Sequence, residues 1–178
     1  MNIQIDRVAL AAKVRDVADF PKPGVMFKDV TPLLLDHVTF STAVDAMVMH
    51  FGRGTVDKVV GIEARGFILA APVAYHFGAG FVPARKLGKL PGATRSVSYQ
   101  LEYGDETLEV HEDAISVGDR VLIVDDVLAT GGTAAATAEL VEGLGGDVVG
   151  LAFLIELGFL NGAAKLDGHH HLSLIHYP

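Results

Sequence analysis

One segment of the chain, residues 121–133, constrains the fold more than any other. Its sequence is Val-Leu-Ile-Val-Asp-Asp-Val-Leu-Ala-Thr-Gly-Gly-Thr. The aliphatic residues at its start are typical of a buried strand, and the glycine and hydroxyl residues at its end are typical of a turn that opens a helix. The helix is indicated by apolar residues at positions i, i+4, i+7 and i+10: Ala134, Ala138, Val141 and Leu144. The segment therefore predicts a strand, a polar turn and a helix, the unit from which parallel sheets are built.

The polar part of this segment is suited to binding a sugar phosphate. At the carboxyl end of a parallel strand, Asp125 and Asp126 can accept hydrogen bonds from neighbouring ribose hydroxyls. The backbone N–H groups of the turn and the positive end of the helix can hold a phosphate. Glycine lets the backbone approach that anion closely, and threonine adds hydroxyl donors. The predicted binding residues of the turn are Ala129, Thr130, Gly131, Gly132 and Thr133.

The acid pair could have two roles besides sugar-phosphate binding. Two acids after an apolar strand also bind magnesium in P-loop nucleotidases, but the chain has no G-x-x-x-x-G-K-S/T motif, so that role is excluded. A buried strand that ends in solvated acids and a flexible turn would account for the acid pair alone. It does not account for the acids, Thr-Gly-Gly-Thr and a helix in that order. The pattern resembles the phosphoribosyl pyrophosphate (PRPP) motif of the type I phosphoribosyltransferases.

The composition predicts one globular domain, residues 1–178, that binds a small ligand rather than nucleic acid. Half of the residues are hydrophobic, and a chain of this length can bury about two thirds of its unfolded surface. The formal net charge of −8 argues against nucleic-acid binding. An anionic ligand therefore needs clustered cations, which Arg85, Lys86 and Lys89 supply in segment 83–92. An ordinary solvated basic loop is the alternative interpretation of that cluster.

Nothing in the sequence indicates a membrane span or a secretion signal. No stretch approaches the roughly 18 uninterrupted apolar residues that a spanning helix requires. The residues after Met1 are mostly polar and do not resemble a signal peptide, and the chain has no cysteine for disulfides. We therefore expect a protein of the cytoplasm that does not bind membranes.

Hydrophobic periodicity predicts three further helices. The first covers residues 6–18, with Leu10, Val14 and Val17 on one face, and ends before the Pro/Gly segment 20–24. The second begins at Ser41 as its cap and runs to Phe51. The third follows a turn at residues 63–66 and has these inward residues: Phe67, Ala70, Ala71 and Ala74.

The remaining apolar runs predict strands at residues 58–62, 80–83 and 147–156, and a hairpin across residues 97–112. The basic segment 85–92 is expected to be a loop. Alternating strands and helices predict an α/β fold, a mainly parallel twisted sheet flanked by helices. In such a fold, ligands bind at the carboxyl ends of the strands.

Five segments in order resemble the adenine phosphoribosyltransferases, a branch of the type I phosphoribosyltransferase family. They are residues 20–32 (Phe-Pro-Lys-Pro-Gly-Val-Met-Phe-Lys-Asp-Val-Thr-Pro), 63–67 (Glu-Ala-Arg-Gly-Phe), 85–92 (Arg-Lys-Leu-Gly-Lys-Leu-Pro-Gly), 98–104 (Ser-Tyr-Gln-Leu-Glu-Tyr-Gly) and 121–133. The first and fourth segments are the ones that point to adenine. The resemblance implies a core at about residues 31–155, a hood over the base from about residues 1–30 and 156–178, and a homodimer.

The resemblance also implies a reaction, in which the 5-phosphoribosyl group of PRPP is transferred to adenine to give AMP and pyrophosphate. Mg²⁺ is expected to bridge substrate oxygens, with Asp125 touching it through water and no direct protein ligand assigned. The residues that resemble the pyrophosphate-binding cations are Arg65, Arg85, Lys86 and Lys89. Glu102 resembles the general acid/base near the purine, and Tyr103 a residue that closes over the substrates. An exposed strand carboxylate is the alternative interpretation of Glu102.

The base is expected to bind at residues 26–28. By the resemblance, Phe27 stacks on the purine, while the backbones of Met26 and Lys28 read its hydrogen-bonding edge. The alternative for Phe27 is a plain core aromatic. The chain departs from the family pattern at Lys28, where an arginine is common, which leaves any role for that side chain open.

Two further functions stay compatible with the sequence. A sibling transferase would use hypoxanthine, guanine or xanthine. A regulator would bind PRPP without chemistry, but such proteins carry an added DNA-binding module and a basic surface, and this acidic chain has neither.

Overall fold

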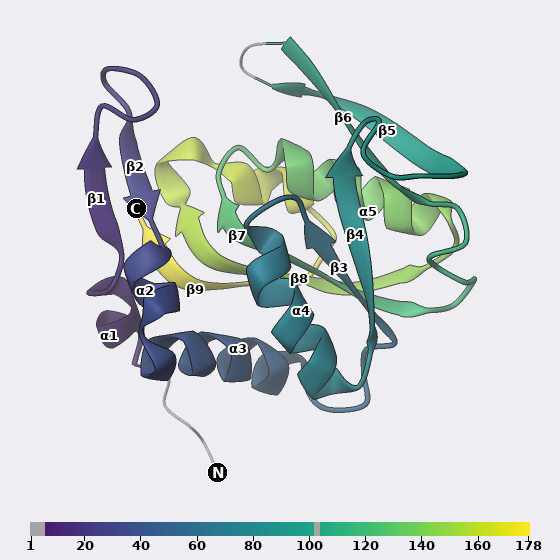
Figure 1. Cartoon of the computed structure of the whole chain (residues 1–178), viewed down its shortest axis with the longest axis horizontal. Helices are drawn as coiled ribbons and strands as arrows, with labels where there is room; N and C mark the ends of the chain where they lie inside the picture. Colours follow the sequence, from purple (N-terminus) through teal and green to yellow (C-terminus); the bar gives the residue numbers. More distant parts are fainter. Residues whose placement is uncertain (1–5, 102–103) are drawn as a thin grey trace. The chain divides into compact units, whose positions relative to one another are not determined.

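The computed structural model describes residues 6–101 and 104–178. The chain forms two compact units, Met1–Ala46 and Met47–Pro178, each of which is described by itself (Figure 1). No helix in the described part of the chain is long and apolar enough to cross a membrane.

The first unit consists of short helices and one hairpin. Its elements are α1 (Arg7–Ala11), β1 (Arg15–Ala18), β2 (Met26–Asp29), α2 (Thr31–Leu35) and the first part of α3 (His37–Phe51). Strands β1 and β2 are antiparallel, with Val17 opposite Phe27. The Pro/Gly segment connects them, so it is the loop of a hairpin (Figure 1).

The predicted helix at residues 6–18 is wrong in its second half. Asp6 caps the helix by accepting a hydrogen bond from the Ala9 N–H, but the helix ends at Ala11 and the chain continues as β1. Val14 and Val17 are only half-buried there. Pairing with β2 explains the difference, because tertiary contacts override a helical period carried by few residues.

Helix α3 begins before the predicted cap, Ser41. The Asp36 carboxylate accepts a hydrogen bond from the Thr39 N–H at 3.0 Å, so Asp36 caps the helix. Ser41 lies inside the helix, where its hydroxyl donates to the Val38 carbonyl. The buried apolar residues of this helix include Ala43, Val44, Met47 and Val48. Helix α2 was not predicted.

The second unit is built on a seven-stranded sheet in the order β5-β6-β4-β3-β7-β8-β9. The strands are β3 (Lys58–Ile62), β4 (Gly80–Lys86), β5 (Thr94–Leu101), β6 (Gly104–His111), β7 (Arg120–Leu128), β8 (Asp147–Leu157) and β9 (His171–Tyr177). Pairing is parallel from β4 to β9, and the β5–β6 hairpin is antiparallel and adds to β4. The predicted mainly parallel sheet is confirmed.

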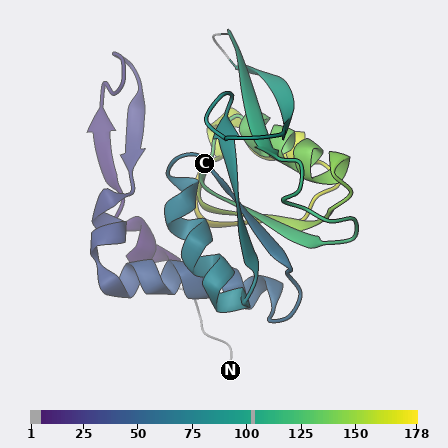
Figure 2. The ribbon, with the colours of Figure 1, turned by 45° about the vertical axis from the view of Figure 1, so that its right-hand side comes forward.

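Helices cover both faces of this sheet. They are α4 (Gly66–Phe77) and α5 (Gly132–Gly143), and the 3₁₀ turns η1 (Gly158–Leu160) and η2 (Gly162–Leu166) follow β8. On β3, Val60 and Ile62 belong to the apolar cluster that contains α5 residues, whereas Gly61 between them faces Ala70 of α4. Because alternate strand residues point to opposite faces, α4 and α5 lie on opposite sides of the sheet (Figure 2).

Most predicted elements of this unit are confirmed, and two details are not. Strand β3 has the predicted bounds, and α5 follows β7 as expected. On α4, Ala71 is exposed rather than inward, and the buried face is formed by Leu69, Ala70, Val73 and Ala74. Strand β4 continues to Lys86, so Arg85 and Lys86 lie on a strand rather than a loop. They pair there with Glu109 and Leu108 of β6, contacts that the local sequence does not reveal.

Strand β7 sets the position of the acid pair. The strand continues to Leu128, so Asp125 and Asp126 lie within it rather than after it. Its pairing with β3 stops at Val124, while its pairing with β8 continues to Leu128. The acids therefore occupy the part of β7 that has lost its neighbour on one side, at the carboxyl edge of the parallel strands.

Candidate functional site

A small polar cavity lies where β7 passes into α5. It has a volume of about 60 Å³ and is lined by Asp125, Val127, Leu128, Ala129, Thr130, Gly131, Thr133 and Ala134. Gly131 precedes the helix with φ +77°, a conformation that favours glycine, and Gly132 is the first helical residue. The turn thus places the positive end of a helix of twelve residues at the cavity.

The turn is held against a second backbone segment that the sequence analysis did not identify. A Cβ on Gly131 would lie 2.2 Å from the Gly162 carbonyl oxygen, and one on Gly162 would lie 2.1 Å from the Ala129 carbonyl oxygen. Only glycines allow this approach of η2 to the turn. The two glycines are far apart in sequence, and no local pattern connects them.

The acid pair lies beside Arg65, with Asp126 buried and Asp125 partly buried. Asp126 is 6% exposed, and its N–H donates to the Asp125 carboxylate at 2.8 Å. Arg65 Nε lies 2.9 Å from Asp126 Oδ2, close enough for an ion pair, but this oxygen accepts no hydrogen bond of acceptable geometry. A Cβ on Gly66 would lie 2.8 Å from Asp125 Oδ1, so the start of α4 packs directly on the pair.

Burial dominates the electrostatics of the pair. Burial and the adjacent charge of Asp126 raise the pKa of the Asp125 carboxyl well above its ordinary value. Burial also raises the pKa of Asp126, although the nearby Arg65 guanidinium acts in the opposite direction. Ionised carboxylates here would be stabilised by hydroxyl donors or by a cation, both of which a bound sugar phosphate with Mg²⁺ would supply.

The predicted cations of the basic cluster converge on Glu63, a residue that the sequence analysis placed in a turn without a role. Glu63 accepts hydrogen bonds from Lys89 Nζ at 2.7 Å, from the Lys86 N–H at 3.0 Å and from Arg85 Nε at 3.3 Å. Burial alone would raise the pKa of Glu63, but these bonds together lower it to about 2. Hydrogen bonds to Glu63 therefore hold the cluster, although the Lys86 and Lys89 side chains are 52% and 48% exposed.

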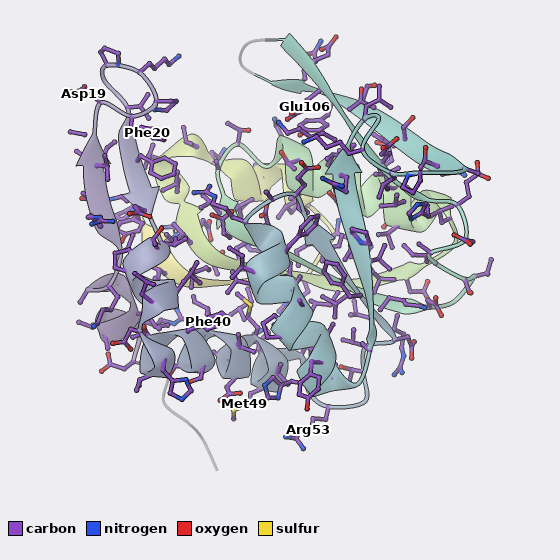
Figure 3. The ribbon with its side chains drawn as sticks, viewed as in Figure 1. Asp19, Phe20, Phe40, Met49, Arg53 and Glu106 are labelled. Atoms are coloured by element: carbon purple, nitrogen blue, oxygen red, sulfur yellow. The ribbon has the colours of Figure 1, made fainter. Side chains whose placement is uncertain are left out.

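Lys86 reaches a second acid through its side chain. Its ammonium forms an ion pair with Glu106 of β6, which Figure 3 labels. The other carboxylate oxygen of Glu106 accepts a hydrogen bond from the Tyr99 hydroxyl at 2.9 Å. Tyr99 in turn accepts a hydrogen bond from the Thr133 hydroxyl at 3.1 Å. Tyr99 and Glu106 were not identified from the sequence, although their positions in the hairpin make them cross-strand partners.

The predicted base-binding residues lie on β2 of the first unit. Phe27 is half-buried, and its ring meets that of Phe20 edge-on with centroids 5.0 Å apart (Figure 3). Met26 is 51% exposed. The Lys28 ammonium forms an ion pair with Asp16 of β1 at 2.6 Å, which gives this side chain a partner within its own hairpin. Glu102 and Tyr103, the predicted acid/base and closing residue, lie outside the described residues.

Comparisons with known proteins identify the family. The family model "Phosphoribosyl transferase domain" matches residues 44–169. An adenine phosphoribosyltransferase of Acidothermus cellulolyticus is 60% identical over 166 residues, which are 93% of this chain and 94% of the relative. That of Desulfitobacterium hafniense is 58% identical over 164 residues, 92% of this chain and 95% of the relative.

Solved structures agree with this result. The crystal structure of adenine phosphoribosyltransferase from Thermoanaerobacter pseudethanolicus has a TM-score of 0.92 and 49% identity, and the match covers 96% of this chain and 99% of that one. The Saccharomyces cerevisiae enzyme, solved with adenine and an imino-altritol bisphosphate, has a TM-score of 0.90 and 38% identity, with coverage of 95% and 98%. The chain belongs to the adenine phosphoribosyltransferase family.

Proposed function

We propose that this protein is an enzyme of purine salvage that transfers the 5-phosphoribosyl group of PRPP to adenine, giving AMP and pyrophosphate. The observation that carries the proposal is the polar cavity between Asp125 and the start of α5, which combines a carboxylate, threonine hydroxyls and a helix N-terminus. Membership of the adenine-specific family supports adenine as the base.

The direct test is nucleotide formation from PRPP and Mg²⁺ with a panel of bases. Adenine should be converted to AMP, with far weaker activity on hypoxanthine and guanine. A site that reads an amino donor leaves its backbone acceptor unpaired against a 6-oxo purine, which costs roughly 1–3 kcal/mol or more. Equal turnover of guanine would favour a sibling transferase, and binding of PRPP without turnover of any base would favour the regulator.

The roles of the PRPP-binding residues follow from charge and position in the second unit. The ribose hydroxyls would donate to Asp125 and to Asp126, whose Oδ2 accepts no hydrogen bond from the protein. The 5′-phosphate would bind the turn formed by Ala129, Thr130, Gly131, Gly132 and Thr133. The pyrophosphate would bind the cations Arg65, Arg85, Lys86 and Lys89, with Tyr103 closing over the substrates.

The acid pair also fits Mg²⁺ brought by the substrate. Two carboxylates are the hard oxygen ligands that Mg²⁺ accepts, and the buried Asp126 oxygen lies beside one cation, the Arg65 guanidinium, without accepting a hydrogen bond. In the described part of the chain no group of three or more acidic, histidine or cysteine residues could hold a metal alone. The ion, when bound with PRPP, would offset negative charge that develops on the pyrophosphate, and Asp125 would orient it through water.

Adenine would bind at β2. We assign stacking to Phe27 and recognition of the purine edge to the backbones of Met26 and Lys28, with the Lys28 side chain retained by Asp16. Phe27→Ala should raise KM for adenine and leave KM for PRPP nearly unchanged. Phe40→Ala, which removes an aromatic side chain from α3 of the same unit, is the matched control.

Glu102 is proposed as the general acid/base for the purine nitrogen. Glu102→Gln should lower kcat by about 10²–10⁴-fold, as expected for a lost acid/base, with little change in the affinity for PRPP. Full kcat in this variant would make Glu102 a structural residue or a mere contact of the base.

The assembly is proposed to be a homodimer. Helix α4 carries exposed apolar side chains, including Ile68 at 45% and Tyr75 at 82% exposure, and Phe81 at the start of β4 is 40% exposed. A second copy of this chain would cover such a face. Light scattering should give twice the chain mass, and Tyr75→Lys should shift the protein toward the monomer. We place the protein in the cytoplasm, a location that cell fractionation would test.

A further inference from the structure

Two residues of the hairpin connect opposite ends of the proposed PRPP site. Tyr99 on β5 lies directly across from Glu106 on β6. The Thr133 hydroxyl donates to the Tyr99 oxygen at 3.1 Å, Tyr99 donates to Glu106 at 2.9 Å, and the Lys86 ammonium pairs with the other oxygen of Glu106. We call Tyr99 and Glu106 the acid bridge. Its two ends are a donor of the phosphate turn and a donor of the basic cluster.

The direction of this chain of hydrogen bonds is fixed. Burial, with the adjacent Glu106 charge, raises the pKa of Tyr99 to about 12, so its hydroxyl stays protonated and remains a donor. The bond from Lys86 lowers the pKa of Glu106, so this carboxylate stays ionised at neutral pH. Each donor in this series of hydrogen bonds therefore points toward Glu106. As a result, the Thr133 hydroxyl and the Lys86 ammonium are both engaged by the acid bridge.

A bound anion needs the same two donors. The proposed function assigns the Thr133 hydroxyl to the 5′-phosphate and the Lys86 ammonium to the pyrophosphate, and the present inference rests on that assignment. A hydroxyl has one proton to donate, so Thr133 cannot donate to Tyr99 and to a phosphate at once. Lys86 has three protons, but the Glu106 carboxylate neutralises its charge and repels a polyanion.

We propose that the acid bridge is a restraint that lowers the affinity of the site for anionic ligands, because it holds Lys86 and Thr133 until the anionic groups of a ligand replace it. A ligand with one phosphate has to displace one end of the bridge, whereas PRPP has to displace both. The bridge therefore costs PRPP more binding free energy than it costs ribose 5-phosphate or free pyrophosphate. Tyr99 and Glu106 are thus positioning residues and not catalytic ones.

The Tyr99 ring and hydroxyl have separable roles. A Cβ on Gly132 would lie 3.2 Å from Tyr99 Cδ2, so the ring packs on the start of α5. Tyr99→Phe keeps this packing and removes only the hydroxyl. Glu106→Gln keeps the shape of the acceptor and removes only the charge. Neither change creates a core cavity, since Glu106 is 22% exposed.

The test is the dissociation constant of PRPP with Mg²⁺, measured by calorimetry without adenine. Breaking one hydrogen bond or surface ion pair changes an equilibrium constant by about 2- to 10-fold, so Tyr99→Phe and Glu106→Gln should each bind PRPP tighter by that factor. Glu112→Gln removes an exposed acid just beyond β6 and should change the constant less than about 2-fold. Ribose 5-phosphate, which meets only the Thr133 end, should gain affinity in Tyr99→Phe and change less in Glu106→Gln.

Double variants distinguish a failure of the bridge proposal from a failure of the proposed PRPP site. Tyr99→Phe should not change the dissociation constant of PRPP in a Thr133→Val background, because the hydroxyl that it would free is missing. For the same reason, Glu106→Gln should change that constant less in a Lys86→Ala background than in the native protein. Unchanged or weaker PRPP binding in both bridge variants would overturn the proposal, even if Thr133→Val and Lys86→Ala weaken binding. If those two variants leave PRPP affinity unchanged, the proposed site itself is wrong, and the bridge proposal fails with it.

Discussion

The carboxylates of Asp125 and Asp126 are harder to ionise than ordinary aspartates, whereas those of Glu63 and Glu106 are easier to ionise than ordinary glutamates. In the first pair, burial outweighs the attraction of Arg65 and raises both pKa values. In the second, hydrogen bonds from lysine and arginine outweigh burial and lower them. All four acids belong to the same unit of the molecule.

This difference separates acids whose charge is incompletely compensated from acids whose charge is already paired. The acid pair on β7 has one nearby cation, Arg65, and an oxygen without a hydrogen bond, so burial keeps its ionisation costly until further donors or a second cation arrive. Glu63 and Glu106 instead hold cations that the proposed function assigns to the pyrophosphate. The first pair should therefore favour PRPP binding, and the second pair should organise or restrain it.

The largest expected effect is loss of function at the β7 acids. Asp125→Asn removes charge-assisted hydrogen bonds to the ribose and the environment of Mg²⁺, and should lower kcat/KM for PRPP by about 100-fold or more. Asp147→Asn, at the exposed start of β8, is the matched control. Steady-state kinetics with varied PRPP provide the measurement. Equal kcat/KM in the two variants would remove the distinction between the acid groups.

A smaller effect is expected from the cations that Glu63 and Glu106 hold. Replacing Lys86 and Lys89 together with Ala should raise KM for PRPP by about 10-fold, leave KM for adenine less changed and flatten the salt dependence of the former. Arg53→Ala removes an exposed cation from the turn after α3 and should have little effect. An unchanged KM for PRPP in the folded double variant would leave Arg65 as the main contact of the pyrophosphate.

Replacing one acid of each group should change the stability of the protein in opposite directions. A folded-state pKa above the unfolded value means that ionisation at neutral pH opposes folding, so Asp125→Asn should raise Tm. Glu63→Gln removes an ionised group that folding favours and should lower Tm. Each change should be about 2–4 °C, the shift that corresponds to 1 kcal/mol in a chain of this size. Calorimetry at pH 7 without ligand is the check, and shifts of the same sign would refute the contrast.

The smallest effect is a pH dependence at Glu63. Its pKa falls from 4.5 to about 2 on folding, so its contribution to stability is present above pH 4.5 and is lost as the pH falls through about 2. The difference in unfolding free energy between the native protein and Glu63→Gln should shrink over that range. Urea titrations at several pH values measure it. A difference that stays constant would show that the carboxylate charge does not hold the cluster.

The two acid groups also show which parts of the structure can be predicted from sequence. The strand and the helix around Asp125 could be predicted because a buried strand, two acids and a glycine turn are adjacent in the chain, and the binding role of the acids stays a prediction. The partners of Glu63 lie 22–26 residues away, so no local pattern reveals that Arg85 and Lys89 converge on it. The approach of Gly162 to Gly131 depends on tertiary packing in the same way.

Errors in the elements have a similar cause. The run from Leu10 to Val17 has a helical period, but pairing with β2 draws its second half into a strand. Ser41 is a good cap residue by type, yet Asp36 caps the helix because its carboxylate meets the Thr39 N–H. Local propensity is a weak guide where tertiary contacts compete with it.

The most direct test of the proposed site is a crystal structure of the protein with AMP, pyrophosphate and Mg²⁺. The account predicts the 5′-phosphate within hydrogen-bond distance of the N–H groups of residues 130–133 and the ribose hydroxyls on Asp125 and Asp126. It also predicts the pyrophosphate on Arg65 and Lys86, with Lys86 withdrawn from Glu106. A nucleotide phosphate bound away from the β7–α5 turn, or an acid pair without contact to the ribose or the metal, would contradict it.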